Sequence, residues 1–287
     1  MTHLIDLPSR LAALAITLRR ALAPCAACAL LFLGSAHAAT PEQIKIGGTG
    51  CALGTMRLLA DAFSAKNPDV NFAFVPNLGS SGGISAMLAG AIHLALISRP
   101  LRENERRPGI TEFEYARTPF VFAISTKSTV SAVTREELAQ IYAGHMPKWP
   151  DGTLTRVVLR PASDIDTGMV KSLSPAIARA LADAEKRSGV RIAITDQDAA
   201  DDLERIPGAI GPTTLALIKS EKRALKALKL DGTEPSVHNS AAGVYPYYKR
   251  LFLVSGNKRS QAAERFTAFV LSGAGRSILT DNGHFYP

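Results

Sequence analysis

Residues Ile44–Ile97 read IKIGGTGCALGTMRLLADAFSAKNPDVNFAFVPNLGSSGGISAMLAGAIHLALI, and this segment decides the fold. Three short apolar stretches within it predict β-strands: 44–46, 70–74 and 92–97. Between them, apolar residues recur at helical spacing after each of two glycine-rich sequences. The order strand, loop, helix, strand, loop, helix, strand predicts an α/β fold with a largely parallel sheet.

The two glycine-rich sequences, 47–54 and 79–83, are expected to be loops at the carboxyl ends of strands, each directly before a helix. Ligands of open α/β sheets bind at that edge. The first turn of a helix offers unpaired N–H donors and the positive end of the helix dipole, which together suit an anion. Ser80 and Ser81 add hydroxyl donors. Two such loops on neighbouring strands favour an anion site over a pair of ordinary tight turns.

The rest of the chain continues the alternation of strand and helix patterns. A polar surface loop is expected over residues 102–117 and a buried strand over 120–124. Thr134 and Glu137 form a capping-box sequence that predicts a helix through Tyr142. Further elements are expected at 156–159 (strand), 251–254 (strand) and 262–271 (helix).

Residues 1–38 are predicted to be a signal peptide. Three arginines precede a 13-residue apolar run, 21–33, and small residues follow it. The run is shorter than the roughly 20 residues that a membrane-spanning helix needs. Cleavage after Ala38 is expected, which places the mature chain in the periplasm. A lipid anchor on Cys25 is the alternative.

Charge and cysteine content narrow the function. The chain of 287 residues has 33 basic and 25 acidic residues, and loss of the signal peptide leaves a net charge of +6. A basic surplus favours anionic ligands. Aromatic residues make up only 6% of the sequence, which argues against a base-stacking surface for nucleic acid. The lysine-rich run 219–229 is typical of a solvated edge. Cys51 alone remains in the mature chain, so no internal disulfide can form.

Nucleotide-binding and catalytic motifs fit less well than an anion site. A dinucleotide fingerprint fails because Leu53 stands where its third glycine belongs, and the lysine of a P-loop is absent. Residues 79–83 match G-x-S-x-G, so a serine hydrolase with Ser81 as nucleophile and His238 or His284 as base is an alternative. That fold needs more strands before its nucleophile than the two found here. The histidines are far apart in sequence, and neither a metal site nor a cofactor is expected.

Eight short sequences are spread in order over nearly the whole mature chain: 48–51 (GTGC), 79–84 (GSSGGI), 97–101 (ISRPL), 138–144 (LAQIYAG), 148–152 (KWPDG), 157–160 (VVLR), 207–211 (PGAIG) and 269–276 (FVLSGAGR). Together they resemble the phosphate-binding proteins of bacterial ABC phosphate transporters, which are PstS-like members of the periplasmic binding protein superfamily. No one of them is decisive, but the ordered set is specific.

The resemblance implies a type II periplasmic binding protein fold. Two α/β lobes, each a mostly parallel sheet flanked by helices, would close hinge-wise on a small anion. Lobe 1 would comprise residues 39–121 and 246–287, lobe 2 residues 122–245, with hinge crossovers near 120–125 and 244–252. The expected protein is an exported monomer that binds phosphate, delivers it to ABC permease subunits, contacts no nucleic acid and is not an enzyme.

The same resemblance implies the anion contacts. Ser80 would donate its hydroxyl, Arg160 would supply the charge, and the N–H groups of Ala52 and Leu53 would face the ligand. The full predicted set is Gly50, Cys51, Ala52, Leu53, Ser80, Ser81, Ser98, Arg160, Ser163 and Thr167.

Three places depart from the family pattern. Ala52 and Leu53 replace a threonine–aromatic pair, and the run 163–168 (SDIDTG) replaces a Ser-Gly-Thr loop. Ser98 replaces an aspartate that would accept the proton of hydrogen phosphate and so exclude sulfate. The two aspartates of the run would oppose an anion unless they face solvent. Two alternatives are therefore open. The protein binds a related oxyanion, or it binds a different anion and acts as a sensor or surface protein without transport.

Overall fold

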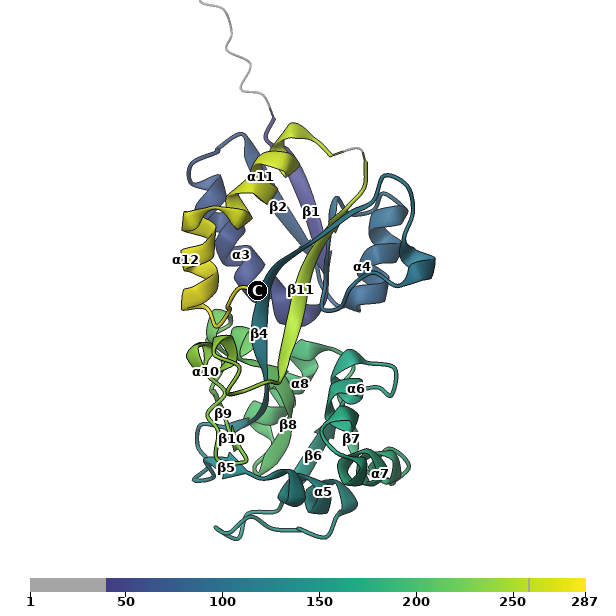
Figure 1. Ribbon diagram of the computed structural model, residues 1–287, viewed down its shortest axis with the longest axis vertical. Helices are drawn as coiled ribbons and strands as arrows, with labels where there is room; N and C mark the ends of the chain where they lie inside the picture. Colours follow the sequence, from purple (N-terminus) through teal and green to yellow (C-terminus); the bar gives the residue numbers. More distant parts are fainter. Residues whose placement is uncertain (1–39, 258) are drawn as a thin grey trace, which may run out of the picture. The chain divides into compact units, whose positions relative to one another are not determined.

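A computed structural model describes residues 40–257 and 259–287, and the predicted signal peptide lies outside them. Residues Pro41–Pro287 form one compact unit (Figure 1). In this described part of the chain, no helix is both long and apolar enough to cross a bilayer.

The first part of this unit has the predicted order of strands and helices. β1 (Glu42–Gly48) lies between β2 (Val70–Val75) and β3 (Leu94–Ile97) and is parallel to both. α3 (Gly50–Ser64) follows β1, and α4 (Gly79–Leu88) follows β2. We expected the glycine-rich sequences to be loops before these helices. Instead, they contain the first turns of the helices. Packing of both helices on β1 outweighs the low helix propensity of glycine.

Two long strands, β4 (Thr111–Ser125) and β11 (Tyr248–Ser255), run antiparallel to each other and connect the two lobes. β11 pairs with β3, and the second half of β4 pairs with β8. The expected surface loop over 102–117 is wrong from residue 111 onward, because that part belongs to β4. Acidic and aromatic residues alternate there (EFEY, 112–115), which is the pattern of a strand. The polarity of the segment led to the prediction of a loop.

The second lobe is built on β8, with β6 parallel to it on one side and β4 antiparallel on the other. The helix predicted from the capping box is confirmed, since Thr134 and Glu137 each accept the other's backbone N–H. The elements between β3 and β11 other than β4 are η1 (Glu103–Glu105), β5 (Ala132–Val133), α5 (Arg135–Ala143), β6 (Arg156–Leu159), α6 (Ile165–Ser172), α7 (Pro175–Ala184), β7 (Arg191–Ile192), α8 (Asp196–Arg205), β8 (Ala209–Thr214), α9 (Leu215–Ser220), β9 (Leu225–Ala227), β10 (Lys229–Leu230) and α10 (Val237–Ala241).

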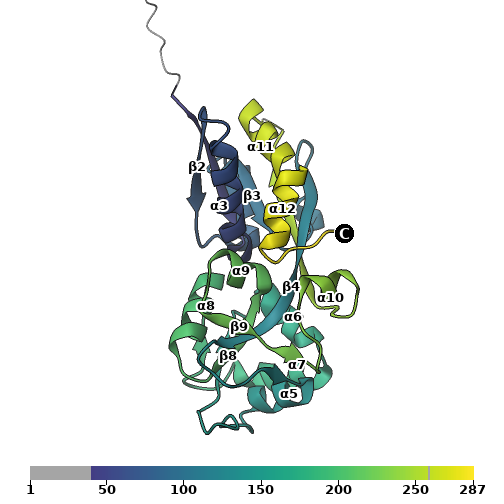
Figure 2. The same ribbon diagram turned by 90° about the vertical axis from the view of Figure 1, so that its left-hand side faces the viewer.

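The chain returns to the first lobe through β11 and ends in α11 (Gln261–Leu271) and α12 (Gly273–Asp281). Both helices pack against α3, and α4 covers the other face of the sheet (Figures 1 and 2). The strand order is β2-β1-β3-β11-β4-β8-β6-β7, with β9 beside β4; β5 and β10 form a separate pair. This is the predicted type II fold of two mostly parallel α/β lobes.

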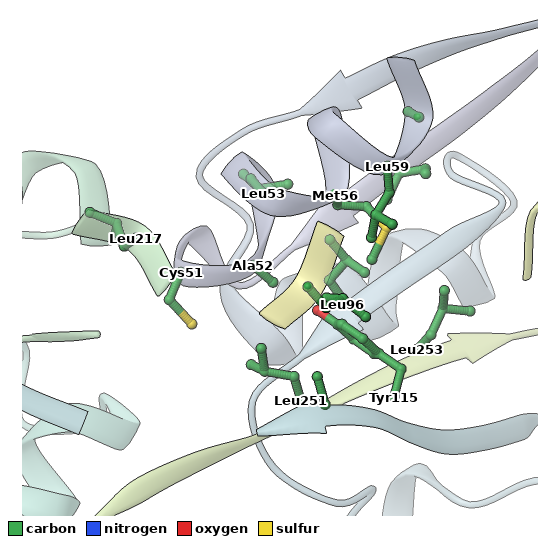
Figure 3. Close-up of a cluster of buried hydrophobic side chains, with 14 of the residues drawn as sticks. Cys51, Ala52, Leu53, Met56, Leu59, Leu96, Tyr115, Leu217, Leu251 and Leu253 are labelled. Carbon is green, nitrogen blue, oxygen red and sulfur yellow. The ribbon is translucent and has the colours of Figure 1, made fainter. Parts of the chain in front are cut away.

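The largest cluster of buried side chains surrounds α3 (Figure 3). Met56 and Leu59 of this helix belong to the same cluster as Leu96 and Leu253 of the sheet. Near the start of α3, Leu217 of α9 joins the cluster from the second lobe. The first turn of α3 is therefore held where the two lobes meet.

A close backbone approach places α4 on β1. A Cβ atom on Gly83 would lie 2.8 Å from the Cα atom of Gly48, well inside van der Waals contact. Gly48 has a φ of 140°, and a Cβ atom there would lie 1.9 Å from the carbonyl oxygen of Leu96. Gly83 thus lets α4 lie directly on β1, and Gly48 lets β1 pass close to the backbone of β3.

We predict that Gly83→Ala lowers the free energy of unfolding by about 1–3 kcal/mol, because the added methyl group forces α4 away from β1. Gly82 is the matched control, since its Cβ atom would meet only Leu78, at 3.5 Å. Gly82→Ala should leave stability unchanged or raise it by up to about 1 kcal/mol through helix propensity. Urea denaturation of both variants measures the difference, and equal losses would contradict the packing explanation.

Candidate functional site

A cavity of about 290 Å³ lies where the two lobes meet. Residues from both lobes line it: Thr49 and Gly50 at α3, residues 77–81 at α4, Ser98, Arg99 and Arg102 after β3, Arg160, Pro161 and residues 163–165 after β6, residues 194–197 at α8, and Lys249 in β11. Most of these segments follow strands or begin helices. The cavity thus occupies the edge at which α/β sheets bind ligands.

The start of α4 offers backbone donors to this cavity. No side chain of the helix caps it. Asn77 and Gly79 each have a φ of 62°, and Leu78 between them is in the right-handed helical region. Such alternation turns successive N–H groups toward one concavity and creates an anion-binding nest. The helix dipole adds positive potential at the same point.

Three buried hydroxyl groups form a chain on the adjacent wall. Thr49 Oγ1 donates to Ser98 Oγ at 3.4 Å, and the Oγ atoms of Ser98 and Ser80 lie 3.3 Å apart. The backbone N–H of Ser98 donates to Ser80 Oγ at 3.1 Å. Because a hydroxyl both donates and accepts, this chain can reorient to present a proton to an anion.

Arg160 supplies a buried positive charge on the opposite wall. Its terminal nitrogens donate to the carbonyl oxygen of Ala193 and to Asp164 Oδ2, each at 2.8 Å. Its Nε has no hydrogen-bond partner within the described residues. Burial lowers the pKa of the guanidinium, but three nearby aspartates, above all Asp196, raise it more. Arg160 therefore stays charged.

Arg99 and Arg102 add positive charge at the rim. Arg99 donates to both carboxylate oxygens of Glu105, at 2.6 and 2.7 Å, and to Ser81 Oγ at 3.0 Å. The hydrogen bonds from Arg99 outweigh burial and lower the pKa of Glu105. Arg102 lies exposed at the cavity wall. At the rim, Glu105 thus neutralises the charge of Arg99, whereas Arg102 adds a positive charge.

Lys249 links β11 to the acidic side of the second lobe. Its ammonium group pairs with Asp166 of α6, and the two side chains are only 2% and 1% exposed. Burial lowers the pKa of Lys249, but Asp166 and other anionic groups raise it more. Burial raises the pKa of Asp166 to about 6, although Lys249 opposes this shift. The pair is a buried electrostatic contact between the lobes.

Six of the ten predicted ligand-binding residues line the cavity: Gly50, Ser80, Ser81, Ser98, Arg160 and Ser163. The other four are buried outside its lining: Cys51, Ala52, Leu53 and Thr167. The Thr167 hydroxyl donates to two backbone carbonyl oxygens, at 2.9 and 3.1 Å. Burial raises the pKa of the Cys51 thiol to about 12, so it stays protonated. The binding roles of all ten residues stay predictions.

Five charged residues of the wall lie outside the predicted set: Arg99, Arg102, Asp164, Asp196 and Lys249. The two arginines follow Ser98 closely in the sequence, so their position next to a predicted site residue could have identified them. Asp196 stands at an ordinary-looking helix start. Lys249 is followed by a second basic residue, Arg250, and the local sequence does not distinguish the buried lysine from the exposed arginine.

The histidines of the described residues do not form the catalytic arrangement of a serine hydrolase with Ser81. No hydrogen bond joins Ser81 to a histidine in the described part of the chain, and Arg99 donates to its hydroxyl. His284 is fully buried, and its Nδ1 lies 3.0 Å from the carbonyl oxygen of Leu279. His238 lies in α10 of the second lobe.

The fold and the polar cavity between its lobes define a class of protein that encloses a small ligand by contacts from both lobes. Residues 34–274 match the PBP superfamily domain, and the chain belongs to this superfamily of periplasmic binding proteins.

Individual relatives agree with this assignment. The chain is 24% identical over 254 residues to the phosphate-binding protein PstS of Bacillus subtilis, covering 84% of this chain and 80% of the relative. A phosphate ABC transporter substrate-binding protein of Clostridium perfringens, solved with bound phosphate, superposes with a TM-score of 0.71 at 21% identity. That match covers 86% of this chain and all of the other. The molybdate-binding protein of Azotobacter vinelandii shares the fold, with a TM-score of 0.59 at 15% identity over 85% of this chain and 99% of the other.

The burial of His284 is expected to make the stability of the protein depend on pH. Burial lowers its pKa from the ordinary 6.5 to about 4, so the native state favours neutral imidazole. The resulting stability is complete above pH 6.5 and is lost as the pH falls toward about 4, by roughly 3 kcal/mol. We predict a shallower decline in the free energy of unfolding for His284→Gln over this range in urea titrations. Parallel pH profiles for the variant and the wild type would contradict this.

Breaking the buried pair should be costly. Lys249→Met leaves the Asp166 carboxylate without its partner and should lower the free energy of unfolding by about 3–5 kcal/mol. Adding Asp166→Asn to Lys249→Met should recover most of this loss. Lys45→Met, at an exposed lysine of β1, should change stability by no more than about 0.5 kcal/mol. Additive effects of the two cleft substitutions in urea denaturation would exclude a coupled pair.

Proposed function

We propose that this protein is an exported solute-binding protein that holds phosphate or a related oxyanion between its lobes and presents it to the permease of an ABC importer. The observation that carries the proposal is the meeting of backbone and side-chain anion donors in one cavity. The uncapped start of α4 lies on one wall, and the buried cation Arg160 lies on the other. Ser80 and Ser98 add hydroxyl donors.

The relatives support the same ligand. The Bacillus subtilis relative is named a phosphate-binding protein, and the Clostridium perfringens protein was solved with phosphate. Of the predicted contacts, those of Ser80, Ser98, Ser163 and Arg160 are the ones best placed for an anion in the cavity. No covalent step is needed, because release to a permease requires only that the lobes open.

The remaining parts of the proposal follow from the family and the sequence. The N-terminal segment directs export and is cleaved near Ala38, and the mature protein acts as a periplasmic monomer. Lobe 1 (39–121 and 246–287) and lobe 2 (122–245) move about the crossovers formed by β4 and β11. Permease subunits dock on the lobes.

Thermal unfolding in a buffer without phosphate tests the ligand assignment. Ligand at 100 times its dissociation constant adds about 2.7 kcal/mol, which raises the Tm of a chain this size by roughly 5–10 °C. We predict this shift with phosphate, and its loss in Arg160→Ala. Arg160→Lys, which keeps the charge but not the forked donors, should retain part of it. Arg179→Ala, at an exposed position of α7, is the matched control and should keep the full shift.

The absence of any shift with phosphate, sulfate or molybdate would overturn the oxyanion assignment. A full shift in Arg160→Ala would instead remove Arg160 from the site.

A further inference from the structure

Carboxylates outnumber cations in and directly behind the inner wall of the cavity. Arg160 and Lys249 provide two positive charges there. Asp164, Asp166 and Asp196, all from the second lobe, provide three negative ones. An anion that enters the cavity therefore meets a carboxylate as well as the hydrogen-bond donors of the wall. The existing partners of the three aspartates identify which carboxylate that is.

Two of the three aspartates are already occupied. Asp164 accepts the backbone N–H of Asp166 at 2.8 Å through Oδ1 and an Arg160 N–H at 2.8 Å through Oδ2. Asp166 is buried against Lys249 and does not line the cavity.

Asp196 has an oxygen left to interact with a ligand. Its Oδ2 accepts the backbone N–H of Cys51 at 3.1 Å, in the first turn of α3. Its Oδ1 lies 3.8 Å from Arg160 and 3.9 Å from Lys249, beyond hydrogen-bond distance of both. The side chain is 11% exposed and lines the cavity.

Asp196 takes the place of an anion at α3. That helix has no side-chain cap of its own and no acidic residue in its first turn. Gly50 makes room for the carboxylate, since a Cβ atom there would lie 2.8 Å from Asp196 Oδ2. The capping box of Thr195 and Asp198, and a 3.1 Å hydrogen bond from Gln197 Nε2 to the Gly50 carbonyl oxygen, hold the start of α8 in place. The carboxylate is a fixed part of the wall.

We propose that Asp196 is a specificity-determining residue that selects oxyanions carrying a proton. An ionised carboxylate only accepts hydrogen bonds. A ligand with an O–H group can donate to Asp196 Oδ1 and gain a charge-assisted hydrogen bond. A fully deprotonated oxyanion has no such donor and is repelled at the same position. This inference rests on the proposed function, because it concerns how the same cavity chooses its ligand.

Monofluorophosphate separates the effect of the ligand's proton on binding from the effects of its charge and shape. At about pH 8 it is a dianion like hydrogen phosphate, but only hydrogen phosphate has an O–H group to donate. Isothermal titration calorimetry of both anions, with sulfate as a second probe without a proton, gives the preference directly. We expect the wild type to bind hydrogen phosphate roughly 10- to 100-fold more tightly than either probe.

Asp196→Asn should lower that preference by about tenfold or more, because its amide keeps an acceptor for the Cys51 N–H and adds a donor. Asp196→Ser, with a shorter side chain, provides a second variant if the first does not fold by circular dichroism. Asp183→Asn, at an exposed position of α7, is the matched control and should keep the wild-type preference.

An unchanged preference in the Asp196 variants, or a wild type that binds sulfate as tightly as hydrogen phosphate, would overturn the inference while leaving an oxyanion-binding protein. If the Asp196 variants bound all of the anions and the wild type bound none, the inference would also be overturned, because Asp196 would then exclude every oxyanion. Binding of none by any protein would overturn the proposed function and this inference with it.

Discussion

Lys249 brings a positive charge from a strand that connects the lobes into the acidic side of the cleft, where Asp166 neutralises it away from water. Removing two ions from water costs several kcal/mol for each, and only close mutual contact offsets that cost. The pair therefore favours one position of β11 relative to α6. Arg160, Asp164 and Asp196 are arranged around it, so the electrostatics of the cavity depend on this contact.

Two helix starts that look alike in sequence acquire different roles from this arrangement. Both α3 and α4 begin at a glycine after a parallel strand, and neither has a side-chain cap of its own. The first turn of α3 receives Asp196 from the other lobe. The first turn of α4 faces the cavity, with its nest of backbone donors next to Ser80. One of the two helix starts is thus occupied by a carboxylate of the protein itself, and the other offers its donors to the cavity.

Most of the fold could be predicted from local patterns. Apolar periodicity located the strands and helices of the first lobe, and the capping residues Thr134 and Glu137 located the start of α5. The loop expected over 102–117 failed because its residues from 111 onward belong to β4, which pairs with distant β11. Pairing of strands this far apart in sequence leaves only a weak alternation in the local sequence.

The sequence by itself determined the order of elements, the family, and a set of small and basic residues, including Ser80, Ser98 and Arg160, that the fold places at one cavity. Only the tertiary structure decided how the charges of that cavity are paired. Lys249, Asp166 and Asp196 come from three different elements and have no common local motif. Their interaction depends on distances of a few ångströms in a poorly solvated space, and these distances exist only after both lobes have packed.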